Sequence, residues 1–183
     1  MSWKIDPAHS QIQFSVRHMM ISTVRGEFES FEGTIDFDQN NPENSKVYVE
    51  IDASSINTRE NDRDNHLRSA DFFNVEQHPT IVFKSKRVEP TSKNKGRIIG
   101  DLTIVGVTKE VVVDVELEGV AKSPWGQTVA GFSGYAELNR KDWGLTWNQA
   151  LETGGVLVGE KIKINVAVEL IKQEEEEAEA AVA

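Results

Sequence analysis

The chain has 183 residues, of which 38% are hydrophobic and 27% charged, a composition typical of one ordinary globular domain. Its formal net charge of −10 argues against a nucleic-acid-binding protein, which needs a basic face for phosphate groups. The chain contains no cysteine, which excludes disulfides and thiol chemistry. No apolar run approaches the roughly 18 residues that a membrane-spanning helix needs.

The N-terminal segment predicts a short first strand over Ser2 to Ile5. It lacks the charged stretch followed by an apolar stretch that is typical of a secretion signal. We therefore expect the protein to be cytoplasmic.

Alternation of apolar and polar residues with a period of two dominates the rest of the chain and predicts strands. With the first strand, the series contains eight or nine strands joined by connections short enough for antiparallel neighbours. Each strand has one apolar face and one charged face, as a sheet closed on itself or a sandwich requires. The alternating segments are 12–16, 28–37, 47–53, 81–83, 98–104, 111–117, 130–138 and 162–170.

One of these segments changes its phase. Phe31, Ile35 and Phe37 share one parity, whereas Phe28 has the other. A straight strand cannot send both sets inward, so we predict a bulge near Glu29-Ser30 that bends the strand. Bends of this kind curl a sheet toward closure.

Two long sections do not fit regular strands, 57–79 and 139–156, and both are candidates for the mouth of a barrel. In the first, Arg63 to Phe73 predicts one or two short helical turns, the first capped by Asn57 or Thr58. Its apolar residues must be buried, most simply over the open end of a barrel. The second section carries Trp143 and Trp147.

The inward faces combine large apolar residues with small ones, among them Gly33, Gly100 and Gly134. Small residues on opposite walls leave unfilled volume, which in an eight-stranded barrel can hold one small ligand. Alternatively, these glycines lie at bends. Because few ionisable residues face inward, a ligand would be apolar and extended. The candidate ligand-binding residues are Ile12, Phe14, Val16, Phe28, Phe72, Phe73, Phe83, Leu102, Phe132, Trp143 and Trp147.

Arg59, Arg63 and Arg68 are candidates for binding a phosphate head group, because guanidinium groups are bidentate donors. The alternative is that they pair with the neighbouring acidic residues Glu60, Asp62, Asp64 and Asp71.

Signals for catalysis are weak. The four histidines have no metal-ligand spacing, and no Gly-x-Ser-x-Gly nucleophile motif is present. We expect no catalytic residues, no metal site and no cofactor. His9, beside Asp6-Pro7, is either a hydrogen-bonded structural residue or, less simply, an acid or base.

The last residues differ from the rest. Segment 173–183 carries five glutamates and no lysine or arginine, and these glutamates account for half of the net charge. We predict a barrel domain over 1–172 and an acidic disordered tail over 173–183.

A set of short motifs in a fixed order resembles the YceI-like family over residues 3 to about 170. The motifs are Asp6-Pro7-Ala8-His9-Ser10, His18, Gly26-x-Phe28-x-x-Phe31-x-Gly33, Arg63-Asp64-x-His66-Leu67-x-Ser69-x-Asp71-Phe72-Phe73, Gly100-Asp101-Leu102-Thr103, Gly106-Val107-Thr108, Gly131-Phe132 and Asn139-Arg140-x-Asp142-x-Gly144.

This resemblance implies an all-β fold, a closed antiparallel eight-stranded lipocalin-like barrel with one or two short helical segments at its mouth. It implies a homodimer, no established catalytic residues, and an apolar tunnel for polyisoprenoid lipids such as prenyl diphosphates and quinones. Exported members carry a signal peptide, unlike this sequence. The function that follows is non-enzymatic binding, transport or storage of a long isoprenoid-type lipid. Two alternatives stay open: an enzyme acting on such a lipid, and a stress-linked interaction protein with an incidental pocket.

Overall fold

The computed structural model describes residues 2–174. Their secondary structure is almost entirely strand, as predicted, with one α-helix, α1 (Asn61–Arg68). The strands are β1 (Ser2–Ile5), β2 (Gln11–His18), β3 (Ser22–Phe28), β4 (Phe31–Asp36), β5 (Lys46–Asp52), β6 (Ile56–Asn57), β7 (Thr80–Ser92), β8 (Lys95–Ile104), β9 (Val107–Lys122), β10 (Thr128–Asn139) and β11 (Val158–Lys172). The segment predicted to be an acidic disordered tail lies almost wholly outside the described residues.

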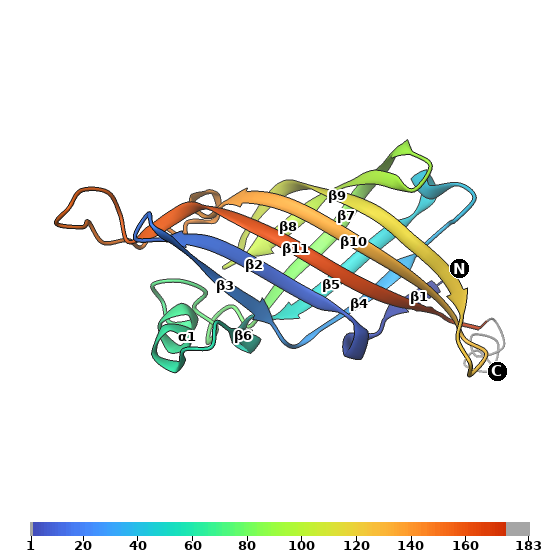
Figure 1. Ribbon diagram of the computed structural model, residues 1–183, viewed down its shortest axis with the longest axis horizontal. Helices are drawn as coiled ribbons and strands as arrows, with labels where there is room; N and C mark the ends of the chain where they lie inside the picture. Colours follow the sequence, from blue (N-terminus) through green and yellow to red (C-terminus); the bar gives the residue numbers. More distant parts are fainter. Residues whose placement is uncertain (1, 175–183) are drawn as a thin grey trace.

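The strands form one antiparallel sheet that closes into an eight-stranded barrel (Figure 1). Three pairs of consecutive segments, β1 with β2, β3 with β4, and β5 with β6, each run as one bent strand. Together with β7 to β11 they make up the eight. Closure occurs where β1 pairs with both β4 and β11, so that Trp3 lies opposite Ile35 on one side and Lys172 on the other. The predicted closed barrel is therefore confirmed.

The predicted bend at Glu29-Ser30 is present. β3 ends at Phe28 and β4 begins at Phe31, and both phenylalanines are buried. The two residues between them are held from another bend, because the Ser30 amide donates to Ser55 Oγ at 3.0 Å and the Glu29 amide donates to the Ser55 carbonyl. The interruption is therefore a bend fixed by hydrogen bonds, and it lets both phenylalanines face inward.

The start of α1 differs from the prediction. Its N-cap is Glu60, whose carboxylate accepts from the amides of Asp62 and Arg63. The prediction that Asn57 or Thr58 caps the helix is wrong, because both have other partners. The hydroxyl and amide of Thr58 both donate to the buried carboxylate of Asp64.

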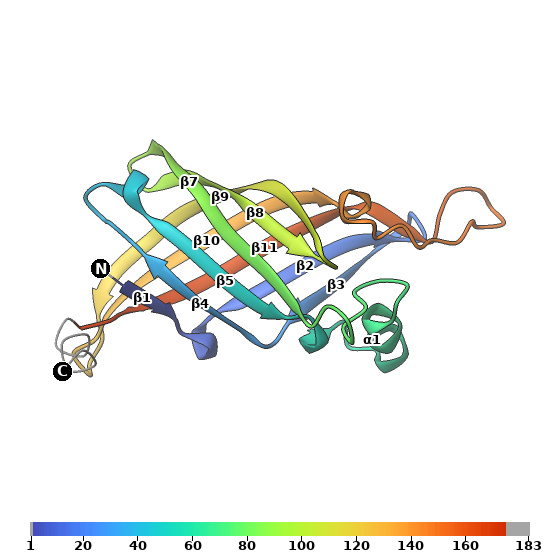
Figure 2. The same cartoon turned by 180° about the vertical axis from the view of Figure 1, so that it is seen from behind.

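One end of the barrel is filled by side chains. α1 and the turn after it cover this end, where Leu67 and Phe73 pack against the main apolar core (Figure 2). From the β10–β11 connection, Trp143 and Leu145 add buried side chains, and Trp143 Nε1 donates to the Leu102 carbonyl at 2.9 Å. The prediction that the 57–79 section covers a barrel end fits this arrangement.

The other end contains β1, the end of β11, the β7–β8 hairpin and the segment between β4 and β5, as both views show. A second apolar cluster lies here around buried Trp3 and Leu170, with Phe37 and Phe132 in edge contact at 5.1 Å between ring centroids. In the part of the chain that is described, no helix has the length and apolarity to cross a membrane.

Candidate ligand-binding cavity

The barrel encloses a cavity of about 610 Å³. Its walls are apolar residues from nearly every strand, joined at the helix end by Leu67, Phe72 and Phe73. No aspartate, glutamate or histidine of the described residues contributes to the lining; its only charged residues are Lys93, Lys95 and Arg140. The enclosed part of the site is therefore suited to an apolar molecule.

The exposure of the inward side chains also indicates a hollow interior. Phe14, Phe83, Leu102 and Phe132 all line the cavity, yet each is half-buried rather than buried. In a close-packed interior such side chains would contact neighbours on all sides. Here part of each surface faces empty volume, which a ligand can cover.

The inward glycines do not themselves provide this volume. A Cβ atom at Gly100 would lie 2.7 Å from Phe83 Cζ, and one at Gly26 would lie 2.5 Å from Phe14 Cζ. The aromatic rings lie over the glycines of adjacent strands and occupy the space that a side chain would take. The cavity thus arises from the barrel's diameter, and the expectation that small wall residues create it is corrected.

The structure places ten of the eleven predicted ligand-binding residues in the lining. Trp147 is the exception, since it packs against His66 and Phe72 at centroid distances of 4.6 and 5.4 Å. The role of these residues in binding stays a prediction. The ten are Ile12, Phe14, Val16, Phe28, Phe72, Phe73, Phe83, Leu102, Phe132 and Trp143.

The three arginines proposed for a head group lie outside the lining. Arg63 donates to the hydroxyl and carbonyl oxygens of Thr58, and Arg68 donates to the carbonyls of Ser54 and Ile56. These bonds fasten the 54–58 segment to α1. They replace the predicted pairing with acidic neighbours, while the side chain of Arg59 is exposed.

The cavity opens at the end away from α1. The exposed residues in its described lining all come from that end: Gln39 before η2 (Pro42–Asn44), and Pro90, Ser92, Lys93, Asn94 and Lys95 in the β7–β8 hairpin. At the α1 end, by contrast, Phe72 and Trp143 are 7% and 3% exposed. The two sections expected to form the mouth instead form the closed end.

Sequence reasoning missed a buried cation at the closed end. Arg140 is 4% exposed, and its guanidinium donates to the carbonyls of Leu145, Trp147, Gly159 and Val158. Burial lowers the pKa of Arg140. The residue holds the 144–157 connection against the barrel, and no pattern in the sequence marks backbone carbonyls as its partners.

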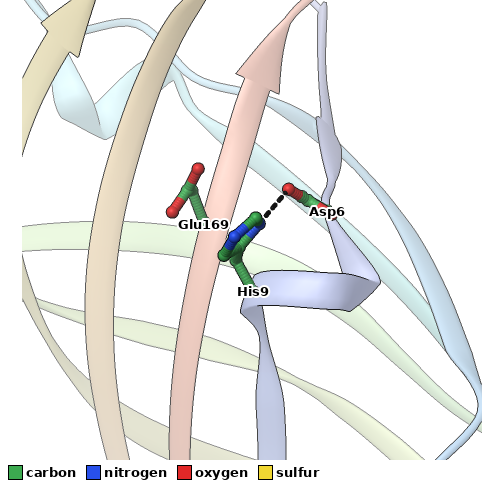
Figure 3. A group of neighbouring side chains, drawn as sticks. All are labelled: Asp6, His9 and Glu169. Atoms are coloured by element: carbon green, nitrogen blue, oxygen red, sulfur yellow. Dashed lines mark hydrogen bonds and ion pairs between the residues drawn. The ribbon is translucent and has the colours of Figure 1, made fainter. Parts of the chain in front are cut away.

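A second group of polar residues lies where β1 passes into β2 (Figure 3). One side-chain oxygen or ring nitrogen from each of Asp6, His9 and Glu169 lies within 4.8 Å of the other two, and His9 Nδ1 is 2.7 Å from Asp6 Oδ2. Between its pairings with β1 and β2, β11 would have unpaired backbone groups. The Asp6 amide donates to the Glu169 carbonyl, and Ser10 Oγ accepts from the Glu169 amide at 3.0 Å. We assign this motif a structural role in closing the barrel.

The turn that contains Asp6 and His9 is expected to make the free energy of unfolding depend on pH. The hydrogen bond to Asp6, then the charges of Asp6 and Glu169, raise the pKa of His9 above 6.5. A raised folded-state pKa gives stability that is full below the unfolded-state pKa and lost as pH rises through the folded-state value. We expect His9→Gln to reduce the free energy of unfolding more at pH 6 than at pH 9, measured by urea titration. An equal reduction at both pH values would contradict this role.

A closed eight-stranded antiparallel barrel around an apolar cavity is a lipocalin-like fold. The model of the YceI-like domain matches residues 3–170, and the chain belongs to this family. A UPF0312 protein of Staphylococcus epidermidis is 43% identical over 168 residues, which cover 91% of this chain and 95% of the relative.

Solved structures share the fold. A YceI protein of Campylobacter jejuni has a TM-score of 0.75 at 36% identity, covering 86% of this chain and 90% of that one. Burkholderia cenocepacia BcnA has a TM-score of 0.80 at 21% identity, covering 90% and 98%. A polyisoprenoid binding domain from Saccharophagus degradans has a TM-score of 0.72 at 11% identity, covering 93% and 98%. At such identities the last two likenesses concern the fold alone.

Proposed function

We propose that the protein binds a long isoprenoid-type lipid in its barrel, for transport or storage and without chemical change. The observation that carries this proposal is the apolar cavity of about 610 Å³, whose exposed lining residues, among those described, all lie at one end. The description of the Saccharophagus relative as a polyisoprenoid binding domain supports the choice of lipid.

The polar groups of the lining support a binding role over catalysis. General acid–base catalysis most often uses histidine, aspartate or glutamate, and the described lining contains none of these. The buried cation Arg140 is already bonded to four carbonyls. The lining does contain Lys93, Lys95 and Tyr135, so the absence of carboxylates and histidine from its described residues favours binding over an acid–base pair of the usual kind. The cytoplasmic location and the homodimer stay predictions.

The proposal is tested with two substitutions on adjacent, oppositely facing residues of β9. Val113 lines the cavity, whereas Val112 is 47% exposed on the outer face. We expect Val113→Trp to fill part of the cavity and weaken geranylgeraniol binding by about tenfold or more, since each 1.4 kcal/mol is tenfold. Val112→Trp should bind like the wild type.

Binding is measured by titration followed by tryptophan fluorescence, and native mass spectrometry after gentle purification should show a bound lipid that organic solvent extracts. Failure of the wild-type protein to bind any isoprenoid would overturn the proposal. Equal binding by both variants would place the lipid outside the barrel.

The cavity volume also predicts a dependence on chain length. A cavity of about 150 Å³ holds benzene, roughly 25 Å³ per carbon, so about 610 Å³ holds on the order of 24 carbons. We expect affinity to rise about tenfold for each isoprene unit from C10 to C20, because five more carbon atoms at about 0.3 kcal/mol each give roughly 1.5 kcal/mol of binding free energy. Beyond about C25 it should level off as further units extend from the opening. A continued rise through C40 would contradict this limit.

A further inference from the structure

The opening of the cavity is basic, although the protein as a whole is acidic. Lys93 lies at the turn of the β7–β8 hairpin and Lys95 begins β8, and both line the cavity where it meets solvent. They are the only exposed charged residues in the described lining. An isoprenoid chain inside the barrel would bring its head group to this rim.

Neither lysine has a partner within the described part of the chain. Elsewhere on the barrel, Lys86, Lys141 and Lys161 form ion pairs with aspartate or glutamate, with Nζ–oxygen distances of 2.6 to 3.6 Å. Lys93 and Lys95 form no such pair and no side-chain hydrogen bond there. Their ammonium groups thus remain available to an anion from outside the chain.

Two carboxylates on neighbouring elements affect the positive charges of Lys93 and Lys95 unequally. Glu116 lies directly opposite Lys95 across the β8–β9 pairing, and Glu43 lies on η2, which packs beside β7. Neither lines the cavity. Glu116 lowers the attraction of Lys95 for an anion, which leaves Lys93 as the stronger of the two cations.

The rim also contains uncharged polar residues that suit a phosphate group. Gln39, Ser92 and Asn94 line the cavity at the same end. Among the described lining residues, the closed end presents no comparable set: the cation there, Arg140, is buried and bonded to carbonyls. The two ends of the cavity are thus chemically different, one polar and basic, the other apolar.

We propose that Lys93, assisted by Lys95, binds the phosphate head group of the lipid at the opening, with the chain running inward so that its tail lies near Phe72 and Phe73. This rests on the proposed function, and it adds the position and charge of the head group and the direction of the chain. Phosphate recognition by a free lysine is an interaction of point charges, strengthened by hydrogen bonds to the anion.

The test compares geranylgeranyl diphosphate, geranylgeraniol and inorganic diphosphate in titrations of the full chain. We expect Lys93→Gln to weaken binding of geranylgeranyl diphosphate about tenfold and Lys95→Gln about threefold, in line with the strength of charged hydrogen bonds. Binding of geranylgeraniol should change less than about twofold, because an alcohol has no charge for the lysines to attract. Raising the salt concentration should reduce the difference between the two lipids.

Lys109→Gln is the matched control. Lys109 is exposed and forms no ion pair among the described residues. Its backbone lies opposite Leu102 in the β8–β9 pairing, near the closed end of the barrel. Its substitution should leave both affinities unchanged.

The outcomes separate the two proposals. If neither lipid binds the wild type, the proposed function fails. If both bind and Lys93→Gln affects neither, the barrel still binds lipid but the head-group site is overturned. If inorganic diphosphate binds as tightly as geranylgeranyl diphosphate, the rim is a free anion site and the inferred lipid orientation is overturned.

Discussion

Replacing Arg140 with methionine is expected to lower the free energy of unfolding by about 3 kcal/mol, since a buried acceptor left unsatisfied costs about 1–3 kcal/mol. The guanidinium donates at 2.7 and 2.8 Å to the carbonyls of Leu145 and Trp147 and at 2.8 Å to that of Gly159. Methionine fills a similar volume but donates nothing. Part of the cost is avoided if the 144–157 connection opens and water reaches the carbonyls.

Urea unfolding measures this loss, and hydrogen exchange of the Leu157 amide, which donates to the Gln149 carbonyl, reports opening of the connection. Lys141→Met is the matched control. Lys141 is the exposed neighbour, paired with Glu160 at 2.6 Å, and a surface pair contributes at most about 1 kcal/mol. Similar losses in the two variants would show that Arg140 does not hold the connection.

Phe72→Ala is expected to destabilise the ligand-free protein by about 3 kcal/mol, the lower part of the range for deleting a core phenylalanine. Phe72 is 7% exposed, and its ring contacts His66 and Trp147 at centroid distances of 5.1 and 5.4 Å. It also lines the cavity, so a bound lipid that reaches it should add stability that the variant loses. The drop in Tm should therefore be larger with geranylgeraniol bound than without it.

Phe73→Ala tests the same end of the cavity. Phe73 also lines the cavity, and its ring packs edge-on against Phe28 at 5.8 Å. Trp125→Ala is the control for aromatic loss, because Trp125 is 86% exposed in the β9–β10 turn and its removal should leave Tm unchanged. If both phenylalanine variants lose the same stability with and without lipid, this end is a structural plug that the lipid does not touch.

The fold was predictable from sequence because its signals are local. Strand alternation fixes which residues face inward, and the change of parity between Phe28 and Phe31 located the bend at Glu29-Ser30. The apolar face of 67–73 also predicted a segment that covers a barrel end. Such signals depend only on neighbours along the chain, and Phe14, Phe83 and Phe132, which alternation predicted to face inward, line the cavity.

The candidate site was predictable only in part. The sequence supplied the wall residues and the family resemblance, but it placed the mouth at the end that proves to be closed. Alternation repeats equally toward both ends of a strand, so it gives no information about which end is filled. The arginines at 59, 63 and 68 were attractive as phosphate ligands, yet Arg63 and Arg68 bond to backbone carbonyls, which every residue possesses and which leave no trace in the sequence.

The sequence by itself determined the strands, their inward faces, the bend in β3–β4 and the apolar character of the interior, because each follows from the order of side chains over a few residues. Tertiary structure alone decided that β1 closes on β11, that Glu169 lies beside His9, that Arg140 is buried, and that Lys93 stands at the open end. Each of these depends on contacts between residues distant in the chain. Closure brings Trp3 opposite Lys172. Only in the closed barrel do the strands line one cavity, with α1 over one end and the β7–β8 hairpin at the other.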